Sequence, residues 1–182
     1  MIVFARADDY FFGLLHSRAH EVWALKMGTR LENRPRYTPT TCFDTFPLPQ
    51  PTLDQEAAVA MAARELSETR SLWLNPPEWT MEKGLVFPVS ANSPWERYAS
   101  NFDTPASGTA CYSTRVSKDA ASAKHLAKRT LTNLYNARPA WLDGLHKSLD
   151  AAVFAAYGWP ATLTDTELLE RLLALNLSRS KG

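Results

Sequence analysis

Apolar residues recur at helical spacing in five segments of the chain, with polar residues between them. An apolar residue at every third or fourth position marks one side of a helix, which then packs against a core. The pattern predicts helices over residues 11–27, 55–73, 119–137, 141–159 and 168–179. We therefore expect a mainly α-helical protein.

Residues that start or stop helices support these boundaries. Gly28 is a typical stop for the first helix, and Thr52 can cap the second. Pro76-Pro77 ends that second helix, because proline supplies no N–H and disfavours the helical conformation in the residue before it. Thr164 and Glu167 match a capping box and open the last helix.

The apolar positions also predict which side of a helix is buried. In the helix 55–73 these positions are Ala57, Met61, Leu66 and Leu72. We expect the two C-terminal helices to bury their leucine stripes against each other. We expect Phe11, Phe12 and Trp23 to form an apolar face that the rest of the chain does not cover.

The remaining segments predict little regular structure. Residues 2–5 are typical of a strand, residues 31–51 of loop and short strands, and residues 80–117 of irregular chain with short strands at most. The expected fold is mainly α with a small β or irregular portion, in which a helical spacer and C-terminal helices follow a partial α+β domain. The expected divisions are residues 1–52, 53–79, 80–117 and 118–182.

Composition adds only broad limits. The chain has 182 residues, which suffices for one domain or two small lobes, and its formal net charge is +1. Any basic surface must therefore be local. Two cysteines without a Cys-x-x-Cys motif, and no signal peptide or long apolar run, favour a cytoplasmic protein with reduced thiols and no membrane partner.

Two histidines form the first candidate site. His16 and His20 are four residues apart, so on a helix they would share a side, as in half of a zinc site. No cluster of cysteine or histidine elsewhere supplies further ligands. The sequence favours two packing or surface histidines over a metal site.

The stretch LNPPEW, residues 74–79, is the second candidate. Asn-Pro-Pro followed by an aromatic residue is typical of the catalytic loop of DNA amino-methyltransferases, in which the ring stacks on a flipped base. Here Glu78 occupies the aromatic position, the stretch follows a helix, and no glycine-rich turn for S-adenosylmethionine precedes it. We interpret residues 75–79 as a turn that ends a helix, and we assign no catalytic or cofactor-binding residue.

Three longer stretches resemble one family. An aromatic-Gly-x-Leu-x-Ser helix at residues 12–17 leads to Tyr37-Thr38 and then to Phe-Pro-Leu-Pro at residues 46–49. This order resembles the end of the target-recognition domain of MmeI-like (type IIL/IIG) DNA adenine-N6 methyltransferases. SLWLNPPEW and the chain from residue 128 resemble the helical regions that follow in that family.

The resemblance implies a non-catalytic fragment. The intact family is an S-adenosylmethionine-dependent methyltransferase, but the segments that bind the cofactor and the target base have no counterpart in this chain. We therefore expect a C-terminal fragment that is no enzyme alone, binds no cofactor itself, and contacts double-stranded DNA together with a methyltransferase portion. The alternatives are an independent helical protein-interaction module and a non-functional gene remnant.

DNA contact is expected from a stiff, polar segment. Arginine can bind guanine or phosphate, and threonine and tyrosine add hydroxyl and aromatic groups. The alternative is that the arginines are solvated loop charges and the tyrosine packs under the helix. A second basic cluster, Lys118, Lys124, Lys128 and Arg129, is more typical of a solvated helix face. The expected DNA-contacting residues are Arg34, Arg36, Tyr37, Thr38, Thr40 and Thr41.

Overall fold

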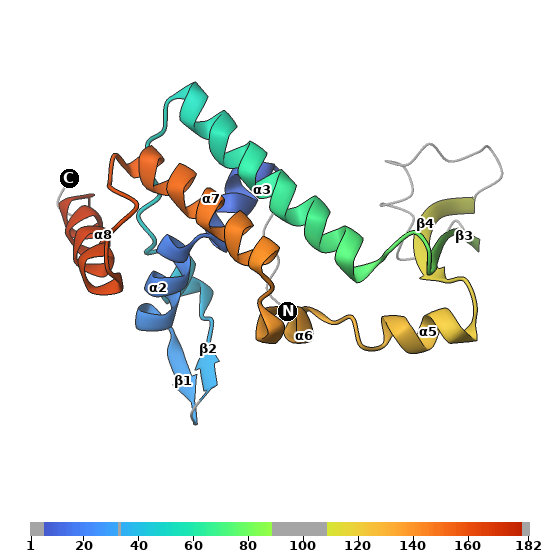
Figure 1. Ribbon diagram of the computed structural model, residues 1–182. Coiled ribbons are helices and arrows are strands. Elements are labelled where there is room, and N and C mark those ends of the chain that lie inside the picture. The colour runs from blue at the N-terminus through green and yellow to red at the C-terminus, as the bar shows by residue number, and fades with distance from the viewer. Residues whose placement is uncertain (1–5, 33, 89–108, 180–182) are drawn as a thin grey trace. The chain divides into compact units, whose positions relative to one another are not determined.

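The computed structural model describes residues 6–32, 34–88 and 109–179. Over these residues the chain is mainly α-helical, with two small antiparallel sheets of two strands each, which confirms the expected fold class (Figure 1). The strand expected at residues 2–5 lies outside the described part. None of the described helices is long and apolar enough to cross a membrane.

The first part of the chain contains only short elements, and the three longest helices and the two longest strands follow it. The short elements are α1 (Asp9–His16), α2 (Arg18–Met27), β1 (Thr29–Leu31), β2 (Arg34–Arg36) and the π-helix η1 (Pro39–Phe43). The others are α3 (Leu53–Leu74), β3 (Thr80–Pro88), β4 (Thr109–Ser117), α5 (Ala120–Leu126), α6 (Leu131–Ala137), α7 (Ala140–Tyr157) and α8 (Asp165–Arg179).

The chain divides into two compact units. Unit 1 combines residues 1–70 with residues 138–182, and unit 2 consists of residues 71–137. Unit 1 is thus built from two stretches that lie far apart in the sequence.

The first predicted helix is in fact two helices, so the prediction of one helix over residues 11–27 is wrong. Ser17 has an extended backbone (ψ 156°) and separates α1 from α2. Its hydroxyl donates to Leu14 O (2.7 Å) and accepts from His20 N (3.4 Å), so one side chain serves the ends of both helices. Asp150 on α7 accepts from Arg18 N (2.7 Å), which supplies a partner for a free N–H of α2. The predicted stop at Gly28 is confirmed.

The core of unit 1 joins its two stretches. Helix α2 packs against α7 and α8, and α1 packs against α2 and α7. Phe11 and Trp23 are buried in this core. The expectation of an uncovered apolar face is therefore wrong for these two residues. The main contacts of α7 are with α1 and α2 and those of α8 are with α2, whereas we expected the two C-terminal helices to pack on each other.

Helix α3 has the predicted extent but buries another face than predicted. Its start carries a capping box in which Gln55 N donates to Thr52 Oγ1 (3.3 Å) and Gln55 Oε1 accepts from Thr52 N (2.9 Å). Of the predicted apolar positions only Leu66 is buried, while Met61 is 70% exposed. The positions that face the core with Leu66 are Val59 and Ala63. Gly13 on α1 faces Val59 and Ala63, and its missing side chain lets α1 approach α3 closely.

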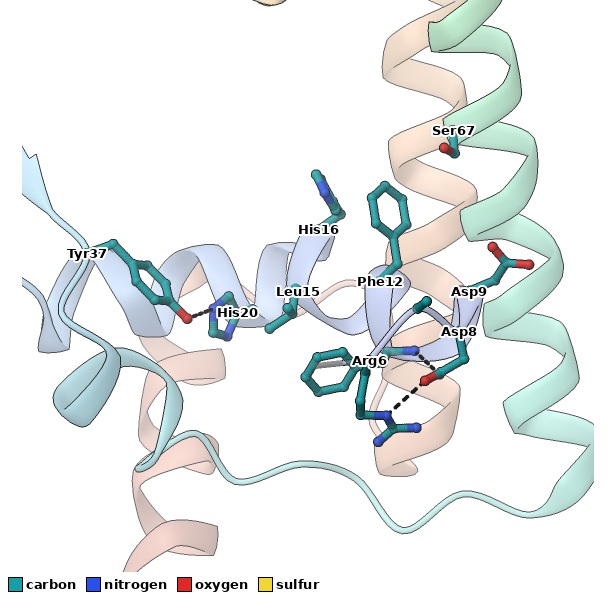
Figure 2. A pocket seen from close by; sticks show the side chains of 11 residues that line it. Arg6, Asp8, Asp9, Phe12, Leu15, His16, His20, Tyr37 and Ser67 are labelled. Atoms are coloured by element: carbon teal, nitrogen blue, oxygen red, sulfur yellow. Dashed lines mark hydrogen bonds and ion pairs between the residues drawn. The ribbon is translucent and has the colours of Figure 1, made fainter. Parts of the chain in front are cut away.

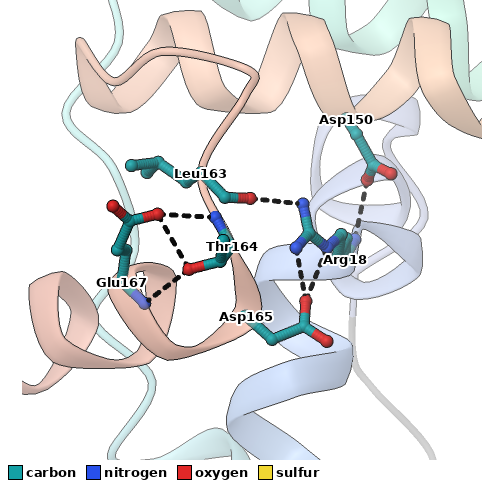
Figure 3. A network of polar contacts seen from close by, with 6 residues as sticks. All are labelled: Arg18, Asp150, Leu163, Thr164, Asp165 and Glu167. Atoms are coloured by element: carbon teal, nitrogen blue, oxygen red, sulfur yellow. Dashed lines mark hydrogen bonds and ion pairs between the residues drawn. The ribbon is translucent and has the colours of Figure 1, made fainter.

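Arg18 ties the start of α8 to α2. Its Nε and Nη2 donate to Asp165 Oδ1, and its Nη1 donates to Leu163 O (2.9 Å), as Figure 3 shows. The capping box predicted for α8 is confirmed, because Glu167 Oε2 accepts from Thr164 N (2.8 Å) and Glu167 N donates to Thr164 Oγ1 (3.3 Å).

Unit 2 contains more regular structure than the sequence predicts. Strands β3 and β4 pair along nine residues each, from Thr80 opposite Ser117 to Pro88 opposite Thr109, so the expectation of irregular chain is wrong for these strands. The helix predicted over residues 119–137 is also wrong, because it is interrupted between α5 and α6. Thr130 caps α6 by accepting from Asn133 N (3.1 Å), which favours a new helix start at that point.

Candidate nucleic-acid interface

The LNPPEW stretch forms the predicted turn at the end of α3. Pro76 O accepts hydrogen bonds from Trp79 N (3.0 Å) and from the backbone N and hydroxyl of Thr80 (3.1 and 2.9 Å). Asn75 N donates to Ser71 O (2.9 Å), as in a helix end. A catalytic Asn-Pro-Pro loop must offer its asparagine and a proline carbonyl to the substrate. Here the carbonyl of Pro76 is taken up by the turn itself, which confirms the helix-terminating turn.

Arg129, a member of the second basic cluster, packs against other residues, although we expected this cluster to be solvated. The guanidinium of Arg129 lies over the rings of Trp73 and Trp79, with centroid distances of 5.0 and 4.6 Å, and its Nη1 donates to Trp73 O (2.6 Å). Such cation–π contacts, together with a bond to a carbonyl at the end of α3, give Arg129 a structural role within unit 2. Lys124 and Lys128 remain exposed.

The histidines line a cavity of about 530 Å³ in unit 1 (Figure 2). Burial lowers the pKa of both His16 and His20 to about 4, so both imidazoles are neutral at pH 7. His20 Nε2 shares a hydrogen bond with the hydroxyl of Tyr37 (2.9 Å), and the His16 ring lies 4.1 Å from that of Phe12. His20 is thus a packing histidine, and among the described residues no group of three or more metal-binding side chains occurs.

The β1–β2 hairpin carries the two predicted arginines on one face. Thr29 lies opposite Arg36 and Leu31 opposite Arg34 in the antiparallel register. Because opposite residues and alternate residues of a strand share a face, Arg34 and Arg36 project from the same side of the hairpin. Both side chains are exposed. The hairpin extends away from α2 and the other helices of unit 1 (Figure 1).

The register adds Arg30, which sequence reasoning missed. Arg30 lies opposite Pro35 and therefore projects from the other face of the hairpin, where it is also exposed. Across residues 6–32, 34–88 and 109–179, no side chain forms an ion pair or hydrogen bond with the guanidinium of Arg30, Arg34 or Arg36. No signal in the sequence alone places Arg30 on the hairpin, because its position follows from the strand register.

Of the other residues predicted to contact DNA, one is exposed and three have hydrogen-bond partners within the chain. Thr40 is exposed on η1. The hydroxyl of Thr38 shares a hydrogen bond with that of Thr29 (3.2 Å), and Thr41 Oγ1 donates to Thr38 O (3.4 Å), so both are engaged within the chain. Tyr37 is half-buried against His20, and burial raises the pKa of its hydroxyl to about 12. These internal partners support the packing alternative for Tyr37.

Cys42 is a further residue that the sequence did not single out. It is buried, its Sγ accepts from Thr38 N (3.4 Å), and the same sulfur donates to Ala24 O (3.7 Å). The thiol therefore connects the segment after β2 to α2. A lone cysteine in a polar loop gives no sequence signal for such a role.

Comparison with known proteins shows which proteins this chain resembles. The family model described as "MmeI, target recognition domain" matches residues 1–50. DNA methyltransferase A of Bacillus subtilis (strain 168) is 31% identical over 64 residues, which is 35% of this chain and 7% of that protein.

A solved structure, described as the type IIL restriction-modification enzyme MmeI in complex with DNA, matches with a TM-score of 0.58 and 23% identity. The match covers 97% of this chain and 17% of that one, and the match to the Bacillus subtilis protein covers 7% of it, so the chain spans only a small part of the length of either relative. The comparisons confirm the resemblance inferred from the sequence: residues 1–50 match the MmeI target recognition domain, and the fold of the chain is similar to that of a part of MmeI.

Proposed function

We propose that this chain contacts double-stranded DNA through the β1–β2 hairpin, as the recognition part of an MmeI-like DNA methyltransferase system, and supplies no catalytic group itself. The observation that carries the proposal is the exposed pair Arg34 and Arg36 on one face of a projecting hairpin. This hairpin lies within the residues that match the target recognition domain.

The shape and charge of the hairpin suit a DNA groove. The major groove admits a two-stranded β-ribbon, and arginine binds guanine or phosphate through two parallel hydrogen bonds. Glu32 is the one acidic residue in the described part of the hairpin, against three arginines. Because these guanidinium groups have no internal partner in that part of the chain, their donors remain available for DNA.

Catalysis is assigned to a separate methyltransferase portion. An S-adenosylmethionine site of the family needs a glycine-rich turn from a strand to a helix. Within the described chain, the connections from a strand to the next helix, residues 37–38 and 118–119, contain no glycine. These residues do not fit the cofactor, and the proposal routes no chemical step through this chain.

Fluorescence anisotropy with a labelled mixed-sequence duplex tests DNA contact. The unmodified chain should bind with a dissociation constant on the order of 10⁻⁴–10⁻⁶ M, as expected of non-specific binding. Changing Arg34 and Arg36 together to alanine should weaken binding and lower the slope of log K against log salt by about 2, since each lost phosphate contact contributes about 0.9. If one arginine contacts a base instead, the slope falls by about 1.

The matched control is the double variant Lys124→Ala, Lys128→Ala, which removes the same charge from exposed positions of unit 2. It should keep most of the affinity. Equal loss in both double variants would mean that only bulk charge matters and that the hairpin proposal is wrong. No binding by the unmodified chain would favour the protein-interaction alternative.

Isothermal titration calorimetry tests the non-catalytic part of the proposal. The chain alone should show no heat of binding with S-adenosylmethionine. A saturable site at micromolar cofactor would contradict the assignment of cofactor binding to another portion.

A further inference from the structure

The direction of the β1–β2 hairpin depends on a few contacts at its base. A two-stranded hairpin is at best marginally stable in water without packing. The strands here have three residues each, and the hairpin extends away from the helices of unit 1 (Figure 1). Whatever holds the base therefore decides where the exposed arginines point.

The main polar contact at that base joins Tyr37 to His20. Tyr37 follows β2 directly, and its hydroxyl lies 2.9 Å from Nε2 of His20 on α2 (Figure 2). The two rings also lie against each other, with centroids 5.7 Å apart.

His20 is itself held rigidly. Only 4% of its surface is exposed, its ring makes an edge contact with the buried ring of Phe46 at 4.6 Å, and its backbone N donates to Ser17 Oγ. His20 thus gives the hairpin an attachment point whose position is set by the core. Its Nδ1 is buried and has no hydrogen-bond partner within the described chain. An unpaired buried nitrogen costs free energy, which argues that the bond at Nε2 has a function of its own.

The other contacts at the base of the hairpin fix the distance between the hairpin and α2. They do not fix the angle between the two. A Cβ on Gly28 would lie 2.6 Å from Ala24 O and 2.9 Å from Arg36 O, so the strand approaches the end of α2 as closely as glycine permits. The remaining side-chain contacts there are a bond between two rotatable hydroxyls, Thr29 and Thr38, the bond from Thr41 Oγ1 to Thr38 O, and the long bonds to Cys42 Sγ. Thr38 O also accepts from Thr41 N (3.1 Å) and Cys42 N (2.8 Å), but these backbone bonds lie within the segment that follows β2. By contrast, the hydroxyl of Tyr37 shares its hydrogen bond with the His20 ring, which cannot rotate freely because it is packed in the core.

We propose that His20 is a positioning residue for the hairpin: by holding the Tyr37 hydroxyl, it fixes the direction in which the hairpin projects. As far as DNA contact is concerned, this role rests on the proposed function. Tyr37 then belongs to the support of the interface, and Arg34 and Arg36 belong to its contacting surface.

Amide hydrogen exchange tests the position of the hairpin without DNA. Tyr37→Phe removes one oxygen and should speed exchange in residues 29–38 at least tenfold, with the exchange of α7 unchanged. Tyr157→Phe is the matched control, because the Tyr157 hydroxyl donates to Pro47 O over the same 2.9 Å within unit 1. It should leave residues 29–38 unchanged. Equal exchange of residues 29–38 in Tyr37→Phe and the unmodified chain would overturn the proposal.

Two substitutions of His20 separate positioning from packing. The amide of His20→Gln reaches about as far from the backbone as Nε2 does, so it should keep the bond and the slow exchange. His20→Leu keeps the packing but not the bond, and should reproduce the fast exchange of Tyr37→Phe. If His20→Gln and His20→Leu behave alike, His20 acts only as a core residue and the proposal is wrong.

DNA binding gives the second measurement. Tyr37→Phe should weaken duplex binding about three- to tenfold with all arginines in place, and His20→Gln should not. Unchanged binding in Tyr37→Phe with faster exchange would overturn the link between hairpin direction and DNA contact. If the unmodified chain binds no duplex, the proposed function fails, while the exchange experiment still decides whether His20 positions the hairpin.

Discussion

Gly13 lies where three helices of unit 1 approach one another closely, and adding one methyl group there should destabilise the fold. A Cβ at this position of α1 would lie 2.9 Å from Ala63 Cβ, 2.9 Å from Val59 Cγ1 and 3.2 Å from Leu149 Cδ1. The first atom is fixed to the backbone of α3, and the second belongs to a β-branched side chain with restricted rotation. Neither can swing aside, so α1 must move away from α3.

Two effects of opposite sign set the size of the change. Replacing glycine with alanine inside a helix gains about 1 kcal/mol of helix propensity. Overpacking a filled core costs about 1–3 kcal/mol, and two rigid contacts below 3.0 Å favour the upper part of that range. We therefore expect Gly13→Ala to lower the free energy of unfolding by about 1–2 kcal/mol.

Gly144 provides the matched control, since it lies in α7 of the same unit and a Cβ there would meet nothing within 4 Å. Gly144→Ala should raise the free energy of unfolding by about 1 kcal/mol. Urea denaturation followed by far-ultraviolet circular dichroism measures both variants on the same transition. If Gly13→Ala stabilises the protein as much as Gly144→Ala does, the close packing of α1 on α3 is refuted.

Three further predictions concern pH, a turn and a cap. Because burial lowers the pKa of His16 and His20 to about 4 from 6.5, the unfolded chain binds protons first as the pH falls. The contribution of these two histidines to the free energy of unfolding should thus be constant above about pH 6.5. It should fall below that pH by up to about 1.4 kcal/mol per pH unit for each histidine, and equal urea midpoints at pH 7 and pH 5 would contradict this. Glu32 has a positive φ of 56°, so Glu32→Gly should stabilise the hairpin by about 0.5–1 kcal/mol. The effect should appear as slower amide exchange in residues 29–36, and faster exchange would argue against a strained turn. Thr164→Ala removes the cap of α8 and should cost about 1 kcal/mol in thermal or urea unfolding, whereas an unchanged midpoint would mean that the cap contributes nothing.

Local signals predicted the helix boundaries that local chemistry sets. The start of α8 follows from Thr164 and Glu167 alone, because the two side chains bond to each other's backbone within one turn. The interruption at Ser17 was missed, although serine is a good cap, because apolar spacing continues through it and because the free N–H of Arg18 finds its partner, Asp150, only on α7. Strands β3 and β4 were missed for a similar reason, since each finds its hydrogen bonds only in the other.

The buried face of α3 shows a second limit of sequence reasoning. Met61 is larger and more apolar than Ala63, so hydrophobicity alone places the wrong residue inside. Ala63 is buried because it faces Gly13, fifty residues earlier, at a separation that no larger side chain allows. At the candidate interface, the polar residues of the segment predicted Arg34 and Arg36 as contact residues. The position of Arg30 on the hairpin could be identified only from the strand register.

The hydrogen-bond partner of Tyr37 likewise could be identified only from the fold. His20 precedes it by 17 residues and belongs to a helix, and nothing in the intervening sequence joins the two side chains. Sequence patterns thus identified the exposed polar segment that we propose as the DNA contact, but not the residue proposed to set its direction.

The two-part construction of unit 1 has a consequence for how the protein is made. Gly13 on α1 meets Leu149 on α7, which the ribosome adds 136 residues later (149 − 13). At about 5–20 residues per second, the apolar sides of the first two helices wait on the order of 10 s for the helices that cover them. During that interval they are exposed to chaperones and to neighbouring nascent chains. A chain cut short before α7 would leave these surfaces permanently uncovered and open to proteolysis.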